Sequence, residues 1–202
     1  MIAALFVQTN GCYFGLPDVD PWDAARDARA YAGPQPVVAH PPCERWGRYA
    51  EGGPSHHGRF RRGDDGGCFE SALASVRRFG GVLEHPAGSS AWATFGLVAP
   101  VPGAGWTAAG DMRGWTCCVE QGHYGHRARK PTWLYACRVE LPSLPWGASE
   151  ATIRPREGRD PREEQKRGAI ERMSRRERAA TPHAFRDLLI QMARSVARKE
   201  AA

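Results

Sequence analysis

The first forty residues contain two apolar runs with a helix-forming segment between them. Residues 3–7 and 36–39 are the apolar runs, and each has the composition of a buried strand. Residues 23–31 are rich in Ala and Arg and favour a short helix. This order predicts a βαβ unit, which is followed by a long loop, rich in Gly, Arg and His, over residues 43–67.

The middle of the chain carries a helical period followed directly by a strand. Four apolar residues between positions 69 and 76 recur at the i, i+3, i+4 and i+7 spacing of one helix face. Gly80 and Gly81 are expected to end this helix. Residues 81–86 then predict a short buried strand that a proline stops.

The second half adds two strands and a closing helix. Residues 116–120 and 132–139 flank a Gly-His-Tyr-Gly-His turn and predict an antiparallel hairpin. Residues 142–168 are rich in Pro, Gly, Arg and Glu and predict a linker or a small recognition excursion. Thr181-Pro182 is typical of a helix start, so a closing helix is expected over residues 181–199.

These elements predict one compact α/β domain over residues 1–202, with a mostly parallel sheet that carries an antiparallel hairpin. A content of 42% hydrophobic residues, including seven Trp, excludes a wholly disordered chain. No apolar run approaches the roughly 20 residues that cross a bilayer, and the first residues lack the features of a signal peptide. We therefore expect a cytoplasmic protein without a membrane partner. The net charge of +6 is compatible with a polyanion.

Cys43 is the first candidate for chemistry. It follows the strand at residues 36–39 and the pair Pro41-Pro42, whose rings restrict the backbone. Ligands of open α/β sheets bind at the carboxyl ends of the strands, so Cys43 lies where a nucleophile would be placed. A structural cysteine beside a rigid turn is the alternative. The six cysteines are too few and too scattered for a disulfide scaffold and are expected to be reduced.

Glu84 is the second candidate. It lies at the end of the strand at residues 81–86, at the same sheet edge as Cys43 if the two strands are neighbours. Burial raises the pKa of a carboxyl, so we expect Glu84 to donate a proton near neutral pH. The alternative is a structural role, in which Glu84 caps the following turn or pairs with an arginine.

The order of these motifs resembles that of the DNA cytosine-5 methyltransferases. In that family a Pro-Cys motif carries the nucleophile and a later Glu-Asn motif carries the acid. Pro42-Cys43 and Glu84-His85 follow the same order here, with His85 where Asn is usual. Residues 83–89 look like the variant of phage-type members, which suggests an origin in a phage or mobile element.

Two later segments extend the resemblance. Residues 124–132 resemble the family's Tyr-Gly turn into a basic strand start, and residues 172–182 are similar to the stretch before its closing helix. The resemblance implies a methyltransferase-like fold that methylates cytosine in DNA at C5, with S-adenosylmethionine as the methyl donor. Cys43 would add to C6 while Glu84 protonates N3. It also implies a flipped base or a single strand, because a base within a duplex is out of reach.

The expected substrate contacts lie near these two residues. They are Pro42, Trp46, His85, Arg127, Arg129 and Lys130. Trp46 is expected to stack on a base, although large aromatic residues mostly fill cores. The three basic residues are expected to hold the base or a phosphate, with a solvated strand entrance as the alternative.

The cofactor region is expected to be truncated. Residues 4–11 hold one glycine where the family has two or three, and the interval from Phe6 to Pro42 is short for the family. The expected contacts of S-adenosylmethionine are Phe6, Gly11, Asp18 and Asp20. The two aspartates also suit a surface turn or a helix cap.

Three alternatives stay open. The chain is either the methyltransferase just described, a non-catalytic relative that binds nucleic acid, or an enzyme that uses another one-carbon donor or acts on a pyrimidine nucleotide. A zinc site is not expected, because Cys117, Cys118, His123 and His126 lack the spacing of a standard site.

Overall fold

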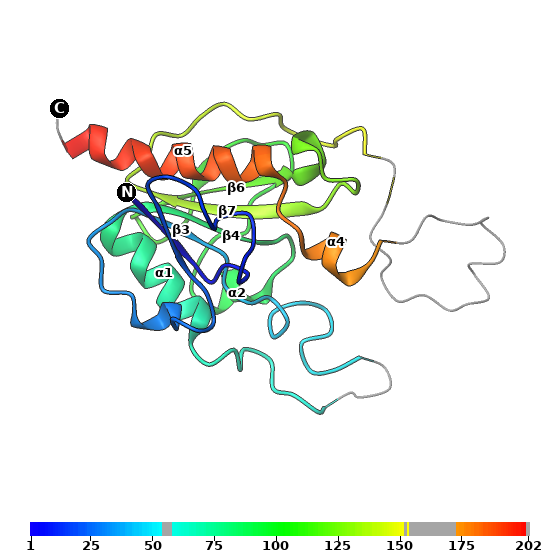
Figure 1. Cartoon of the computed structure of the whole chain (residues 1–202). Coiled ribbons are helices and arrows are strands. Elements are labelled where there is room, and N and C mark those ends of the chain that lie inside the picture. Colours follow the sequence, from blue (N-terminus) through cyan, green and yellow to red (C-terminus); the bar gives the residue numbers. More distant parts are fainter. Residues whose placement is uncertain (54–57, 152, 154–172, 201–202) are drawn as a thin grey trace.

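A seven-stranded mixed sheet forms the centre of the protein (Figure 1). The computed structural model describes residues 1–53, 58–151, 153 and 173–200. The strand order across the sheet is β2-β1-β3-β4-β7-β6-β5. The strands are β1 (Ile2–Leu5), β2 (Val19–Trp22), β3 (Val37–Ala39), β4 (Gly81–Pro86), β5 (Thr107–Ala108), β6 (Trp115–Glu120) and β7 (Pro131–Cys137).

The sheet has a parallel half and an antiparallel half. Strands β2, β1, β3 and β4 run parallel, whereas β7 is antiparallel to both β4 and β6. The predicted α/β class and the predicted hairpin are confirmed, and the arrangement is compatible with a Rossmann-like fold. Because β7 is reversed, its first residues lie at the edge where β3 and β4 end.

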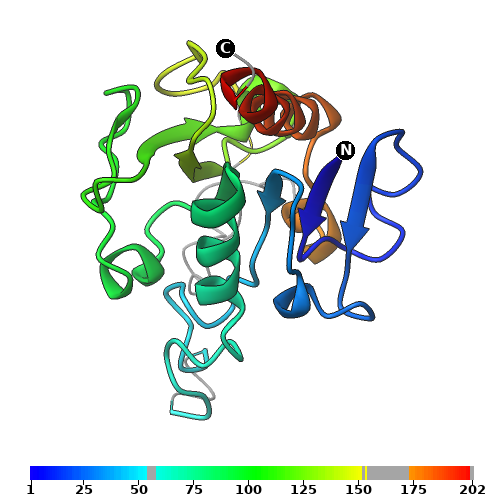
Figure 2. The ribbon, with the colours of Figure 1, turned by 90° about the vertical axis from the view of Figure 1, so that its left-hand side faces the viewer.

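The two faces of the sheet are covered by different helices. Helix α5 (His183–Glu200) packs on the face that contains Ile2, Ala4 and Val82. Helix α1 (Cys68–Phe79) packs on the opposite face, with Ala3 and Leu83. Figure 2, turned by 90°, shows α1 and α5 at different sides of the strands. Burial on both faces explains why these strands are continuous apolar runs in the sequence.

The boundary between α1 and β4 depends on two glycines. Gly80 ends α1 with a φ of 78°, and Gly81 begins β4 with a φ of 132°. A Cβ atom on Gly81 would lie 1.9 Å from the carbonyl oxygen of Val37, so only glycine allows β4 to pair with β3 here. The predicted end of the helix at Gly80-Gly81 and the predicted strand at residues 81–86 are both confirmed.

The segment over residues 23–31 differs from its prediction. It forms only the short 3-10 helix η1 (Ala28–Ala30). The Asp23 carboxylate accepts from the N–H groups of Ala25 and Arg26, and Asp27 accepts from the N–H of Arg29. Such side-chain bonds compete with the helical hydrogen-bond ladder.

Several short elements complete the fold. They are α2 (Ser90–Thr94), the 3-10 helix η2 (Gln121–Tyr124) and α4 (Arg175–Ala179). Of the predicted excursion at residues 142–168, only 142–151 and 153 belong to the described residues. Among the helices in the described ranges, none is both long enough and apolar enough to cross a membrane.

Candidate functional site

Cys43 and Glu84 lie at the edge of the sheet where the parallel strands end. Cys43 follows the carboxyl end of β3 and is exposed. Glu84 lies on the neighbouring strand β4, and 12% of its side-chain surface is exposed. Partial burial, followed by the charges of Glu84 and Glu44, raises the pKa of the Cys43 thiol. The two predicted catalytic residues therefore lie close enough for the charge of Glu84 to affect the Cys43 thiol.

His40 connects these two strands. Ala39 is paired with Leu83, so the next residues, His40 and Glu84, become neighbours. The Nδ1 atom of His40 lies 2.9 Å from Oε2 of Glu84. The Nε2 atom lies 2.8 Å from the hydroxyl of Tyr13, which is buried in the loop after β1. His40 was not among the predicted site residues; its position directly after the predicted strand at residues 36–39 is the signal in the sequence, and the register between β3 and β4 determines the contact.

Gln121 holds the other oxygen of the Glu84 carboxylate. Its Nε2 atom donates to Oε1 of Glu84 at 3.2 Å and to Oγ1 of Thr132 at 3.0 Å. Gln121 is fully buried at the start of η2, so its amide has a fixed position. The carboxylate is thus oriented from both sides, while part of its surface stays accessible to a ligand.

The protonation of Glu84 differs from the prediction. Burial would raise the pKa of the carboxyl, but the hydrogen bond and charge of His40, with the charge of Lys130, lower it below its ordinary value. The predicted rise in the pKa of Glu84 was wrong, because it followed from burial alone and not from the effects of His40 and Lys130. Near neutral pH the free protein therefore holds Glu84 as a carboxylate and Cys43 as a thiol.

Lys130 approaches the same edge from the start of β7. Burial lowers the pKa of its ammonium, and the nearby Glu84 and Cys43 oppose that effect. The Nζ atom donates to the carbonyl oxygens of Ala179 at 3.4 Å and Ala180 at 2.8 Å. Lys130 thus joins the end of α4 to the Cys43 and Glu84 site.

The two predicted arginine contacts lie differently. Arg127 pairs with Glu177 of α4 at 2.9 Å, and both side chains are largely exposed. The neighbouring His126 also contacts α4, with Nε2 lying 3.2 Å from the carbonyl oxygen of Glu177. Arg129 is half-buried, and its carbonyl oxygen accepts from the N–H of Gly122. Of the three predicted basic residues, Lys130 is the one that affects the pKa of Glu84 and Cys43.

Two other predicted contacts are core residues. His85 follows Glu84 on β4 and therefore points to the opposite face, where it packs against Phe69 and Trp92 and is 1% exposed. Burial lowers the pKa of His85 to about 4, so its ring is neutral. Trp46 is 3% exposed and packs on Phe69 in the same cluster. This position does not suit the predicted stacking of Trp46 on a base, whereas Pro42 is exposed beside Cys43.

The glycine turn after β1 closes on its own chain. A Cβ atom on Gly11 would lie 2.7 Å from the carbonyl oxygen of Gln8, which accepts from the N–H of Gly11 at 2.8 Å. The space that glycine leaves is thus filled by the turn itself. Phe6 has a φ of 58° and packs partly against the core on the α1 face.

The aspartates near β2 are also engaged. Asp20 accepts from Arg26 and from the indole N–H of Trp22, and these contacts lower its pKa. Asp23, at the carboxyl end of β2, accepts from the hydroxyl of Thr9 at 2.6 Å and from two backbone N–H groups. Asp18 is an exposed turn residue with a φ of 59°. Phe6, Gly11 and Asp20 therefore contact other parts of the chain in this conformation, whereas Asp18 is exposed.

The cysteines and histidines of the hairpin do not converge. Cys117 and Cys118 are buried in β6, and the Nδ1 atom of His126 accepts from the N–H of Ala128. Within the part of the chain that the structure describes, no group of three or more His, Cys, Asp or Glu residues is arranged to hold a metal ion.

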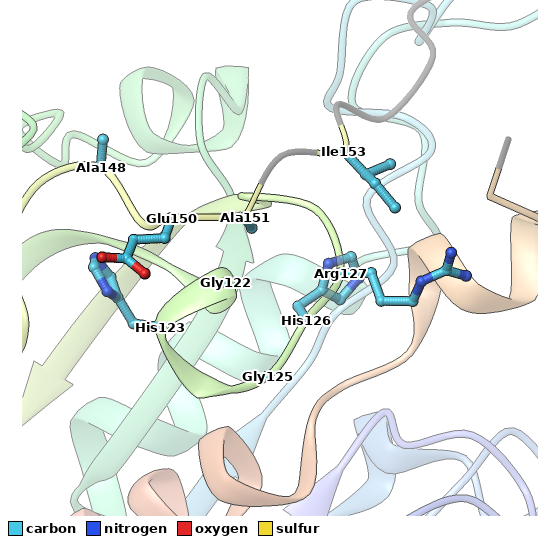
Figure 3. Close-up of a pocket in the computed structure, with 9 residues that line it drawn as sticks. All are labelled: Gly122, His123, Gly125, His126, Arg127, Ala148, Glu150, Ala151 and Ile153. Atoms are coloured by element: carbon cyan, nitrogen blue, oxygen red, sulfur yellow. The ribbon is translucent and has the colours of Figure 1, made fainter. Parts of the chain in front are cut away.

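An open pocket of about 660 Å³ lies between η2 and residues 148–151 and 153. Figure 3 shows His123 and Glu150 at one end and Arg127 and Ile153 at the other. Four of its nine lining residues are Gly or Ala, and it contains neither Cys43 nor Glu84. The pocket and the site of Cys43 and Glu84 are therefore separate places on the protein.

No protein-family model, curated protein or solved structure matches this chain significantly. The fold and the site define an α/β protein with a thiol and a carboxylate at the carboxyl edge of its parallel strands.

Proposed function

We propose that the protein adds the Cys43 thiolate to C6 of a pyrimidine base, the first step of a modification at C5. The observation that carries the proposal is the position of exposed Cys43 within the electrostatic reach of Glu84, at one sheet edge. A thiol nucleophile and a carboxyl that exchanges a proton with the ring are the two groups that this addition needs.

The addition moves two protons and forms a bond from sulfur to carbon. The thiol proton leaves to solvent, sulfur bonds to C6, and N3 of the ring takes a proton from the Glu84 carboxyl. C5 then becomes a nucleophile. Since Glu84 is ionised in the free protein, its carboxylate must first receive the proton that it delivers. The ammonium of Lys130 favours the thiolate of Cys43 by its charge.

Methylation of cytosine in DNA is the reaction that the resemblance implies for this site. The substrate would be DNA, with the base flipped or single-stranded, or a free pyrimidine nucleotide. A donor such as S-adenosylmethionine would supply the methyl group. The residues after β1 and around β2 do not offer open contacts for it, so no step is assigned to this donor.

Hydrogen exchange at C5 tests the proposal without a donor. After addition at C6, C5 takes a deuteron from D₂O, and loss of the original proton followed by loss of sulfur leaves deuterium at C5. We expect deuterium in a single-stranded oligonucleotide containing cytosine, or in deoxycytidylate, as measured by mass spectrometry. Cys43→Ser should abolish the exchange, and Cys12→Ser, a change at another partly buried thiol, should not. Exchange that persists in Cys43→Ser would exclude the proposal.

A nucleic-acid-binding protein without catalysis is the second candidate. The observation that favours it is the engagement of Gly11 and Asp20 by the chain itself. In that case the oligonucleotide would bind with no deuterium incorporation, and calorimetric titration would detect no binding of S-adenosylmethionine.

A further inference from the structure

A continuous hydrogen-bonded chain runs behind the carboxylate at the sheet edge. It passes from the Tyr13 hydroxyl to Nε2 of His40, at 2.8 Å, and from Nδ1 of His40 to Oε2 of Glu84, at 2.9 Å. The side chains of His40 and Glu84 are 13% and 12% exposed, so solvent weakens their contact little. A tyrosine hydroxyl both donates and accepts, so the contact with Nε2 persists whether His40 is neutral or charged.

We propose that His40 and Glu84 hold one proton between them, and that this shared proton is the one Glu84 delivers to the pyrimidine ring. His40 acts through Glu84 and is a positioning residue. The inference rests on the proposed function for the delivery step, whereas the sharing of the proton stands on the geometry of the pair. It adds to the site a residue that has no counterpart in the motifs considered above.

The proton balance closes without any other group. In this proposal, His40 starts as an imidazolium, with the shared proton on Nδ1 and a second proton on Nε2. When the base binds, the Nδ1–H bond breaks and an O–H bond forms on Glu84. That bond then breaks as the N3–H bond forms, which leaves a neutral imidazole and a carboxylate. The proton returns along the same path when sulfur leaves C6.

Four ionisable groups from different parts of the chain face this pair. They are Tyr13 of the loop after β1, Cys43 after β3, His85 on β4 and Lys130 at the start of β7. Tyr13 is in turn close to Cys12, Arg186 and Asp187. Burial and nearby negative charges raise the pKa of Tyr13 well above its ordinary value, and His85 is neutral, so neither changes charge between pH 6 and 9. Cys43 and Lys130 are the two groups that have to be followed separately, because burial lowers the pKa of Lys130.

If the two groups share a proton, replacing His40 should shift two measurable titrations in opposite directions along the pH scale. Two interacting sites lose their protons in two steps that belong to the pair. His40→Asn keeps an amide donor near Nδ1 but removes the second titrating site. The carboxyl of Glu84, no longer beside a charged ring, should then titrate at higher pH. The proton that is delivered to the pyrimidine should be lost at lower pH, because Glu84 alone is left to hold it.

The experiment measures both titrations on the full chain. ¹³C NMR of the Glu84 carboxyl follows its titration without substrate, and C5 exchange in a cytosine oligonucleotide is followed from pH 5 to 9. In His40→Asn we expect the Glu84 carboxyl to titrate at higher pH. We also expect the fall in exchange rate that follows loss of the shared proton to occur at lower pH. The rate at pH 8 should fall about tenfold for each unit of that movement. The part of the rate profile that is due to ionisation of Cys43, which alkylation with iodoacetamide measures separately, should not change its pH.

Two further variants keep the result interpretable. His40→Gln also removes the titrating ring, and it can be used instead of His40→Asn if the latter protein does not fold. His123→Asn makes the same change at a histidine that contacts the carbonyl of Gly147, and it should leave both titrations unchanged. Wild-type exchange with an unchanged profile in the His40 variants would overturn the inference alone. No exchange in wild type would overturn the proposed function and with it the delivery step. The NMR titration would still decide whether the proton is shared.

Discussion

The indole nitrogen of Trp46 donates to Oδ2 of Asp65 at 2.8 Å. The same carboxylate accepts from the backbone N–H groups of Gly67, Cys68 and Phe69, at distances between 2.9 and 3.1 Å. One side chain therefore satisfies the first N–H groups of α1 and also fixes the loop that leads from Cys43. This relationship links the stability of α1 to the position of the nucleophile.

Replacement of Asp65 tests this link. Asp65→Ala leaves the start of α1 uncapped and the buried Trp46 indole without its acceptor, and should lower the free energy of unfolding by about 2 kcal/mol. Asp64→Ala, at the exposed neighbouring residue, is the matched control and should change it by less than about 0.5 kcal/mol. Urea unfolding measures both. Equal effects of the two changes would mean that Asp65 is an ordinary surface residue.

Glu84 should have opposite effects on thiol reactivity and on catalysis. Its charge raises the pKa of Cys43, so Glu84→Gln should lower that pKa and speed alkylation by iodoacetamide near pH 8. The same change removes the group that delivers the proton, so C5 exchange should fall by roughly 100-fold or more.

Glu44→Gln is the control for Glu84. Glu44 also raises the pKa of Cys43, so this variant should be alkylated faster while its C5 exchange is kept. Loss of exchange in both variants would show that the loss is not specific to proton delivery by Glu84.

Lys130 should act on the thiol in the other direction. Its charge lowers the pKa of Cys43, and Lys130→Met keeps the apolar stem without the charge. Alkylation of Cys43 at pH 8 should slow by roughly threefold. Arg127→Met removes a cation that pairs with Glu177 and should leave the rate unchanged. An equal slowing in both variants would point to the net charge of the protein rather than to the site.

Asp111 should make the free energy of unfolding depend on pH in the acid range. Burial acts to raise its pKa, but hydrogen bonds from Tyr135, from the N–H groups of Arg113 and Gly114 and from Arg77 lower it below the ordinary value. A carboxyl with a lowered pKa stabilises the folded state fully above its unfolded pKa of about 3.9. That stabilisation is lost as the pH falls through the folded pKa.

Asp111→Asn should therefore unfold more easily at pH 7, by about 1 to 2 kcal/mol, and the difference from wild type should shrink below about pH 4. Thermal unfolding at pH 7, 5 and 3 measures this. Asp187→Asn removes an exposed partner of Arg186 and should have little effect at any pH. A difference for Asp111→Asn that is constant with pH would contradict the assignment.

The elements predicted well were those with strong local signals. The strand at residues 81–86 follows from an apolar run between a glycine pair and a proline, and α1 follows from its apolar period. Strand β2 was not among the predicted strands, because its four residues are all half-buried and show no alternation. Strand β5 has two residues, which is too short for any sequence pattern.

The site was predictable in part for the same reason. Cys43 follows one strand that the sequence identifies and Glu84 lies near the end of another, so a common edge was expected if the two strands were neighbours. The His40 contact spans 44 positions along the chain and depends on the register between β3 and β4. The lowered pKa of Glu84 was missed because burial, which sequence suggests, is outweighed by partners that only the folded chain brings near.

The placement of β7 between β4 and β6 has a consequence for how the site assembles in time. The β6–β7 hairpin forms from contacts that are short-range in sequence, whereas pairing of β7 with β4 closes a longer loop. A refolding chain should therefore complete the hairpin first and dock it on β4 afterwards. Glu84 gains Gln121 and Lys130 as neighbours only at this docking step. The reactivity of Cys43 is thus a late reporter of folding, which follows the formation of the helices.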